Sequence, residues 1–258
     1  MVRWLPTLAV IAAANSAAAT TPCSGNPDAL GTERVLMVDV RATPRVGRKH
    51  FASTLPLAPK EVVLTFDDGP WPGATERVLD ALHRECVKAT FFLVGARAAE
   101  NPRLARRVLA EGHTVAHHTF SHRLLDHLSV AAAEAEIDRG IAAVEKALYG
   151  RLNQTSAALF FRFPGFASSP ALLDRLSGRG IVVFGADLWA SDWNPMFPAD
   201  QLHLVMNRLG ATGGGILLFH DTRAQTAAMI PAFLRALKRQ GYRVVHVMPA
   251  AGLPALIR

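Results

Sequence analysis

The sequence contains only two cysteines, Cys23 and Cys86, among its 258 residues. An oxidising compartment would therefore permit at most one disulfide. Cys23 lies in an irregular N-terminal segment, and Cys86 lies near the end of a predicted helix. For these reasons we do not expect the two cysteines to bond.

The sequence also lacks any run of lysine and arginine interleaved with aromatic residues, which is typical of a nucleic-acid-binding surface. We therefore expect no nucleic-acid partner. Charged residues make up only 19% of the chain, and 28 basic against 21 acidic residues give a net charge of +7. This balance favours encounters with anionic surroundings, such as an acidic polymer or a membrane surface.

A long hydrophobic run is missing as well, because the apolar stretch from Trp4 to Ala14 is too short to span a bilayer comfortably. It follows Arg3 and precedes the small residues Ala17–Ala19, the order typical of a secretory signal with its cleavage site. Residues 1–19 are predicted to be a cleaved signal peptide, with an uncleaved anchor as the weaker alternative. We expect a secreted or periplasmic protein with no stable membrane insertion.

From Glu61 onward, apolar strand-like runs alternate with segments of helical periodicity. The predicted strands are 61–66, 89–94, 113–118, 159–163, 181–186, 216–219 and 243–247. The predicted helices are 75–85, 102–111, 130–148, 170–177, 199–209 and 225–240. Repeated βα units of this length indicate an α/β fold with parallel strands and outer helices, either a doubly wound sheet or a closed barrel.

The length fits one domain, and the half of the residues that are hydrophobic can form a substantial core. We assign residues 55–258 to this domain and expect a monomer. Residues 20–54 are irregular and rich in proline and basic residues, with one strand candidate at 34–40. They are predicted to wrap the domain as an N-terminal extension.

Polar residues cluster where the predicted strands end. In α/β folds of either kind, reactive residues belong in the loops after the C-terminal ends of the strands. The clusters are Asp67 with Asp68, His118 with His122, Arg162, Asp187, and His220 with Asp221.

Asp67 and Asp68 directly follow an apolar strand, so their side chains diverge and each can take a different role. One can bind a metal ion while the other remains free as a base. Asp68-Gly69-Pro70 is also ordinary turn chemistry, and a simple turn is the alternative.

His118 and His122 are four residues apart, which brings two imidazoles onto one face if the segment turns helically. With one carboxylate they would form a facial site with open positions, suited to one divalent ion. Zn²⁺ is preferred, with Co²⁺, Mn²⁺ and Fe²⁺ as alternatives. Such an ion polarises a carbonyl and lowers the pKa of bound water. We interpret the neighbouring His113 and His117 as structural or surface residues.

If the polarised carbonyl belongs to an amide, its hydrolysis also needs a general acid to protonate the departing amine. His220, which ends an apolar strand, is placed for this role. Asp187, which ends another strand, is predicted to accept a hydrogen bond from one ring nitrogen of His220 and so to fix the tautomer of that ring. Arg162 is predicted to hold Asp67 in its ionised form. Each of these residues has a structural alternative, such as capping a loop.

Together these motifs resemble the polysaccharide deacetylase family of carbohydrate esterases, the NodB type, across Leu55 to Pro249. The motifs are Thr65-Phe-Asp-Asp-Gly-Pro70, His118-Thr-Phe-Ser-His122, Arg162-Phe-Pro164 and Leu217-Leu-Phe-His-Asp221. The resemblance implies a distorted (β/α) barrel of seven strands and makes residues 55–258 a catalytic domain. It implies a metal-dependent hydrolase that removes N-acetyl groups from a glycan substrate such as peptidoglycan, chitin or an exopolysaccharide.

The resemblance also implies roles for individual residues. Asp67 is then the base, His220 is the acid, and Arg162 orients Asp67. A backbone N–H near Gly165 would hold the developing oxyanion, and Leu218 would line the acetyl pocket. The ligands of the metal ion would be Asp68, His118 and His122.

Two departures from the family pattern affect the substrate groove. An aromatic residue usually follows the arginine-proline motif, whereas here Gly165 precedes Phe166, which predicts a more open wall. Two aspartates usually stand three apart before a tryptophan, whereas Asp187 and Asp192 are five apart. We assign the orienting role to Asp187 because it ends the strand, keep Asp192 as the competing choice, and predict that Trp193 stacks on a sugar.

Three other functions stay open at this point. They are an O-acetyl esterase acting on a glycan, a catalytically silent module that binds wall glycans, and a metal-dependent amidohydrolase or phosphatase on another barrel. The presence of Asp67 and His220 argues against the silent module. The last alternative predicts further metal ligands or a bridging lysine, and the sequence offers no evident candidate for either.

Overall fold

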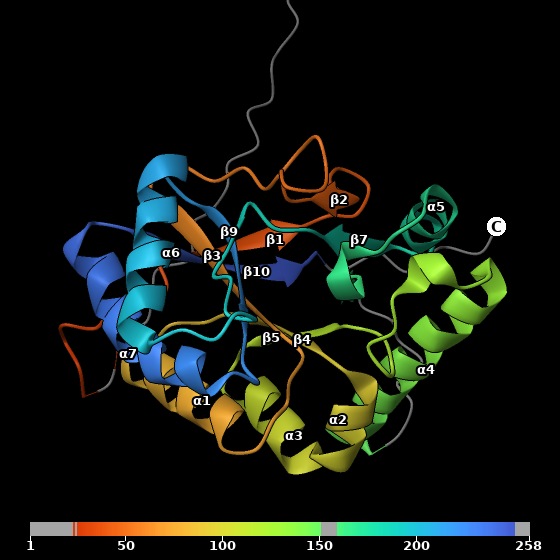
Figure 1. Cartoon of the computed structure of the whole chain (residues 1–258), viewed down its shortest axis with the longest axis horizontal. Helices are drawn as coiled ribbons and strands as arrows, with labels where there is room; N and C mark the ends of the chain where they lie inside the picture. The colour runs from red at the N-terminus through yellow and green to blue at the C-terminus, as the bar shows by residue number, and fades with distance from the viewer. Residues whose placement is uncertain (1–22, 24, 151–158, 251–258) are drawn as a thin grey trace, which may run out of the picture.

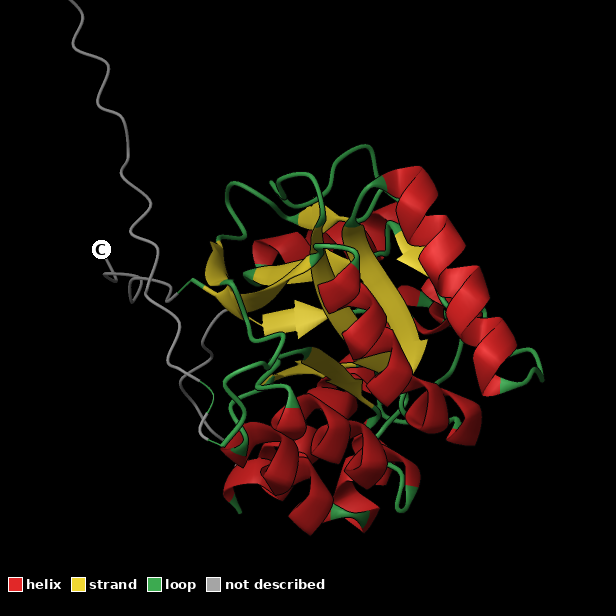
Figure 2. Cartoon of the chain, turned by 90° about the vertical axis from the view of Figure 1, so that its left-hand side faces the viewer, coloured by secondary structure: helices red, strands yellow, loops and turns green. Residues whose placement is uncertain are grey.

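The computed structural model describes residues 23, 25–150 and 159–250. The predicted signal peptide, residues 1–19, lies outside the described residues. Figure 1 shows the strands in the centre of the molecule and the helices at its periphery, and Figure 2 shows the same arrangement from the side. No helix in the described ranges combines the length and the apolar character of a membrane span.

The sheet has ten strands, and every pairing between them is parallel. Their order is β1-β10-β3-β4-β5-β6-β7-β2, with β9 paired to β3 and β8 paired to β9. Among the described residues β8 pairs only with β9 and β2 only with β7, so hydrogen bonds do not close the barrel, which is distorted as expected. The strands are β1 (Arg34–Val38), β2 (Arg45–Val46), β3 (Glu61–Asp67), β4 (Thr90–Leu93), β5 (Thr114–His117), β6 (Leu159–Phe161), β7 (Ile181–Phe184), β8 (Leu188–Trp189), β9 (Gly215–His220) and β10 (Arg243–Pro249).

Helices follow most strands and cover the outside of the sheet. They are α1 (Ala74–Arg84), α2 (Gly95–Glu100), α3 (Pro102–Ala110), α4 (Val130–Tyr149), α5 (Pro170–Gly178), α6 (Pro198–Thr212) and α7 (Ala224–Arg239), with short 3₁₀ turns η1 (Leu125–His127) and η2 (Pro164–Phe166). The predicted helices and the predicted strands after residue 60 are all confirmed. The elements that sequence periodicity missed are α2, β2 and β8, which are too short to show a period.

Alternation along the strands produces two apolar layers. In β3, Leu64 and Phe66 belong to the cluster that packs against α1 and α7. Val63 belongs to a second cluster, formed by the opposite faces of the strands. Thr65 and Asp67 share the face of Val63, because side chains alternate along a strand. This inner face therefore changes from apolar to polar towards the carboxyl end of β3.

The segment before residue 55 contributes to the sheet. The predicted strand at 34–40 is confirmed as β1, which pairs with β10 over five residues. The two residues of β2 pair with β7. The domain boundary predicted at residue 55 stays a prediction.

Cys23 and Cys86 form a disulfide, so the expectation that they do not bond is wrong. The N-terminal segment is held against the end of α1 by Glu85. The Glu85 carbonyl accepts a hydrogen bond from the Gly31 N–H at 2.8 Å, and the Glu85 carboxylate accepts one from the Leu30 N–H at 2.9 Å. These contacts join residues more than fifty positions apart, which is why a local reading of the sequence missed them.

We predict that Cys23→Ser lowers the free energy of unfolding by about 2–4 kcal/mol, because a crosslink over a long stretch of chain restricts the unfolded state. The two cysteines are 63 residues apart. Urea unfolding of the oxidised protein measures the change. Cys86→Ser should lose the same amount, and the double substitution no more than either single one. A wild-type protein that is equally stable when reduced would contradict this prediction.

Candidate active site

Side chains from four strands converge at one edge of the sheet, where the parallel strands end. Asp67, the last residue of β3, lies in register with His220, the last residue of β9. His118 directly follows β5 and Arg162 directly follows β6, and these two strands are paired at that level. The structure thus brings together the residues that the sequence placed at strand ends.

Arg162 and Asp67 form an ion pair in the interior. The Arg162 side chain is completely buried, and its Nη1 donates to Asp67 Oδ1 at 2.6 Å. The guanidinium also donates to Thr65 Oγ1 at 2.9 Å and to the carbonyl of Gly185 at 2.8 Å. Burial lowers the pKa of Arg162, and the Asp67 carboxylate opposes this effect. The pair fixes one oxygen of Asp67 and leaves Oδ2 at 3.9 Å from His118 Nε2.

Asp68, His118 and His122 form a candidate site for a divalent metal ion. Their potential ligand atoms all lie within 4.8 Å of one another. Asp68 Oδ1 lies 3.0 Å from His122 Nε2 and 3.5 Å from His118 Nε2. Burial opposes ionisation of Asp68, but contact with the two imidazoles outweighs it and holds the pKa of this carboxyl well below its ordinary value. One carboxylate and two imidazoles suit Zn²⁺ and related ions, so these residues fit such an ion.

The hydrogen bond made by His118 identifies the nitrogen that can bind an ion. His118 Nδ1 lies 2.7 Å from the main-chain oxygen of Arg162. A carbonyl can only accept a hydrogen bond, so Nδ1 carries a proton, and Nε2, which lies on the side of Asp68, is the nitrogen that can bind an ion. Arg162 therefore holds Asp67 with its side chain and His118 with its main chain.

The loop that carries His122 is irregular and is not the helical turn considered from the spacing. Thr119 and His122 both have a left-handed φ of 62°. Helix α4 supports this loop, because Glu136 accepts from the main-chain N–H and the hydroxyl of Ser121, both at 2.6 Å. Gly140 lies so close that a Cβ there would overlap the Thr119 carbonyl. Sequence reasoning missed Glu136 and Gly140, because no local pattern links α4 to this loop.

Asp192 is the residue that holds His220. Asp192 Oδ1 lies 2.7 Å from His220 Nδ1, and Oδ2 accepts from the His220 N–H and the Thr226 hydroxyl, each at 2.7 Å. Burial alone would lower the pKa of His220, but the hydrogen bond and the charge of Asp192 raise it to about 9. The imidazolium form of His220 therefore persists at neutral pH.

The assignment of Asp187 to His220 is wrong. Asp187 instead accepts three hydrogen bonds at 2.7–2.8 Å, from the main-chain N–H groups of Arg48 and Ile216 and the hydroxyl of Thr54. The reason is the two-residue strand β8, which the alternation pattern did not reveal. Asp187 precedes β8 and Asp192 follows it, so Asp192 is the aspartate on the carboxyl side.

The predicted groove residues lie around the reacting side chains. Trp193 is 43% exposed, and its ring lies 6.1 Å from the ring of His220. Leu218 is buried two residues before His220 on the same face of β9. Gly165 is exposed in η2 with a left-handed φ of 57°. Their roles in substrate binding stay predictions.

Asp221 supports the turn that follows Asp68. It is fully buried and accepts from the hydroxyl of Thr75 at 2.6 Å. A Cβ at Gly69 would overlap the Asp221 carboxyl group, so this position requires glycine. Burial, together with the charges of Asp68 and Asp67, raises the pKa of Asp221 to about 7.

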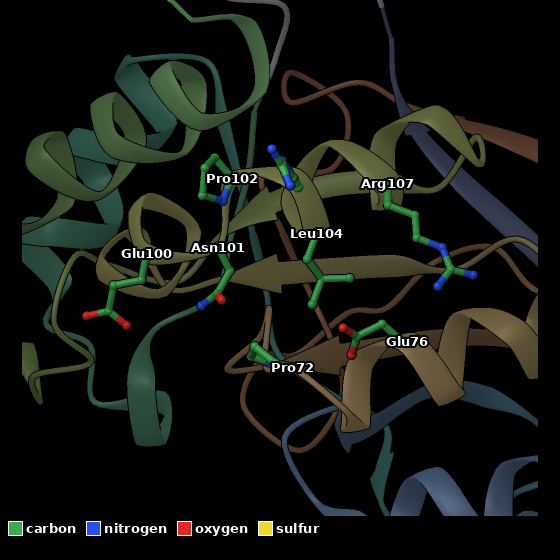
Figure 3. Close-up of a pocket in the computed structure, with 8 residues that line it drawn as sticks. Pro72, Glu76, Glu100, Asn101, Pro102, Leu104 and Arg107 are labelled. Atoms are coloured by element: carbon green, nitrogen blue, oxygen red, sulfur yellow. The ribbon is translucent and has the colours of Figure 1, made fainter.

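A surface hollow of about 520 Å³ lies between the first turn of α1 and the start of α3 (Figure 3). It is lined by Pro72, Glu76, Glu100, Asn101, Pro102, Arg103, Leu104 and Arg107. Glu76 already accepts from the Gly73 N–H, and Arg107 is paired with Asp80 and Glu111. None of the lining residues is one of the converging side chains, so we place the reaction at the strand ends.

Comparison with known proteins identifies one family. Residues 55–183 match the model of the polysaccharide deacetylase family. A peptidoglycan-N-acetylglucosamine deacetylase from Bacillus cereus is 36% identical over 197 residues, which cover 73% of this chain and 86% of that protein. The Listeria monocytogenes deacetylase PgdA is 35% identical over 188 residues, and this match spans only 38% of that longer protein. A solved peptidoglycan deacetylase from Bdellovibrio bacteriovorus has a TM-score of 0.73 at 32% identity, covering 84% of this chain and 58% of that one.

We predict that Asp192→Asn lowers the pKa of His220, because it removes a negative charge that favours the imidazolium. In the wild type His220 is protonated below a pKa of about 9 and loses its proton as the pH rises through that value. NMR titration of the ring resonances measures this pKa in each protein. Asp187→Asn is the matched control and should leave the pKa of His220 in place. A shift in the control without a shift in Asp192→Asn would contradict the assignment.

Proposed function

Because the chain belongs to the polysaccharide deacetylase family, we propose that it hydrolyses N-acetyl groups of an amino-sugar polymer and that peptidoglycan is its substrate. One observation carries this proposal. A buried carboxylate held by arginine, an Asp-His-His ligand set and an aspartate-held histidine meet at one edge of the sheet. The substrate is proposed from the B. cereus and L. monocytogenes relatives, which are named peptidoglycan-N-acetylglucosamine deacetylases.

In this proposal, the metal ligands and Asp67 act on one side of the reacting amide, and His220 acts on the other side. Asp68, His118 and His122 would hold one divalent ion, for which we propose Zn²⁺, and that ion would supply the positive charge that polarises the carbonyl and acidifies water. Asp67 accepts the proton of the attacking water through Oδ2, since Oδ1 is held by Arg162. A backbone N–H near Gly165 holds the developing oxyanion.

On the other side, His220 donates its proton to the departing nitrogen through Nε2, while Nδ1 stays bonded to Asp192. The pKa of His220, raised to about 9, keeps this acid protonated at neutral pH. A departing amine needs that proton more than a departing alcohol does. This favours N-deacetylation over the O-acetyl esterase alternative.

We also propose that the protein is exported and acts as a monomer. The Cys23–Cys86 disulfide supports export, because disulfides persist in oxidising compartments such as the periplasm or the cell exterior. A cleaved signal at residues 1–19 would deliver the chain there.

We predict that Asp67→Asn lowers kcat for acetate release by about 10²–10⁴-fold, because it removes the base while keeping the shape of the side chain. Acetate release from peptidoglycan and from chito-oligosaccharides measures the effect, and binding to insoluble polymer should be retained. Asp80→Asn, the same change at an exposed aspartate, should keep wild-type activity. The wild type is assayed with Zn²⁺, Co²⁺, Mn²⁺ and Fe²⁺ in turn. If it releases acetate from neither substrate with any of the four ions, the proposed function fails and a glycan-binding module becomes the better interpretation.

Removing the ion provides a separate test. Chelation is expected to abolish acetate release, and Zn²⁺ should restore it. His118→Ala should lose the bound ion, measured as metal content per chain after dialysis. His113→Ala, which removes a buried histidine outside the ligand set, should keep it. Equal metal content in the two variants would contradict the assigned ligands.

A further inference from the structure

A row of rings leads away from His220 along one side of the site. The ring of Trp193 lies 6.1 Å from that of His220, and the ring of Trp189 lies 6.0 Å from that of Trp193. Beyond it, Phe166 lies 6.4 Å from Trp189 and stacks on His50 with centroids 3.6 Å apart. Rows of partly exposed aromatic rings suit sugar rings, whose apolar faces pack on them.

The far end of the row is built by a loop that precedes the matched family region, residues 47–50. Its main chain is fixed, because the Lys49 N–H donates to the Ala186 carbonyl at 3.0 Å and the Arg48 N–H donates to Asp187 at 2.8 Å. Gly47 has a φ of 113°, and a Cβ there would lie 2.6 Å from the carbonyl carbon of Gly185. The same Gly185 carbonyl accepts from Arg162, so the loop lies directly behind the arginine that holds Asp67.

His50, the last ring of this row, is uncharged at neutral pH. Burial is the largest cause that lowers the pKa of His50, and the positive charges of Arg162 and Lys49 lower it further, to about 4. At neutral pH the positive charge of the loop therefore lies on Lys49 and Arg48, not on His50.

Lys49 and Arg48 are both exposed, and neither forms an ion pair with any other residue that the structure describes. The Lys49 ammonium lies 5.3 Å from the centre of the Trp189 ring. Asp187 and Asp192 direct their oxygens to other protein donors, and neither is paired with Lys49. The loop thus presents positive charge that is free of direct ion pairs within the described residues, beside a ring that can carry a sugar.

We propose that Lys49, with Arg48 beside it, and the rings of Trp189 and Phe166 form a subsite for a carboxylate-bearing sugar next to the sugar that is deacetylated. This inference rests on the proposed function and adds substrate choice to it. The charge selects an acidic neighbour, while the rings accept any pyranose face. The chain would therefore prefer a glycan with carboxylate substituents over a neutral polymer such as chitin.

The test compares two oligosaccharides of equal length, a neutral N-acetylglucosamine oligomer and a peptidoglycan oligomer whose alternate sugars carry a lactyl carboxylate. Affinities are measured with Asp67→Asn protein, so that neither ligand is consumed. Lys49→Gln should weaken binding of the acidic oligomer about threefold to fivefold at low salt. Binding of the neutral oligomer should change less than twofold, and Lys49→Glu should enlarge the difference.

Lys60→Gln is the matched control, since Lys60 is also an exposed lysine near an aromatic ring, that of Tyr242, but lies before β3 at the opposite end of the strand. It should change neither affinity. Equal losses for both oligomers, or no loss for the acidic one, would overturn the subsite. Because this readout is binding, it decides the subsite even if the wild type releases no acetate, a result that would count against the proposed function alone.

Discussion

The ion pair between Arg162 and Asp67 is the interaction on which the rest of the site depends. Two charges buried together lose their hydration, and such a pair is retained only where further contacts replace the lost water. Here the guanidinium donates to Thr65 and to the carbonyls of Gly185 and Phe184, and lies 4.2 Å over the ring of Phe92. The arrangement therefore fixes geometry more than it adds stability.

The same residue connects the proposed base, Asp67, to the proposed metal ligands. Because the Arg162 carbonyl accepts a hydrogen bond from His118 Nδ1, a displacement of the β6 end would move Asp67 and His118 together. The other two proposed ligands depend on left-handed backbone, with φ of 77° at Asp68 and 62° at His122. Each such residue costs about 1–3 kcal/mol, which the surrounding structure must offset. Packing of Asp221 against Gly69 and of Gly140 against Thr119 supplies this support.

The alternation of strands and helices was predictable from the sequence because most elements after Glu61 are long enough to show their period. The edge of the sheet at which the reacting residues meet followed from the rule that parallel strands end together. The error at Asp187 came from the same rule, because β8 has only two residues and no detectable period. The Cys23–Cys86 disulfide and the support from Glu136 were missed for another reason, since both join segments distant in sequence.

The site has two sides that differ in burial. The buried side carries groups proposed to take part in the reaction, and the exposed side carries groups proposed to select the substrate. Arg162, Asp67 and His118 are buried and are fixed by an ion pair and by hydrogen bonds, so a substitution there alters groups that must keep their geometry. On the other side, Trp193 is partly open to solvent, and the loop at residues 47–50 rests on the protein through main-chain hydrogen bonds. The exposed side chains of Arg48 and Lys49 can change without disturbing Asp67 or His220. A chain that keeps one reaction while adapting to different glycans would therefore be expected to vary on this second side.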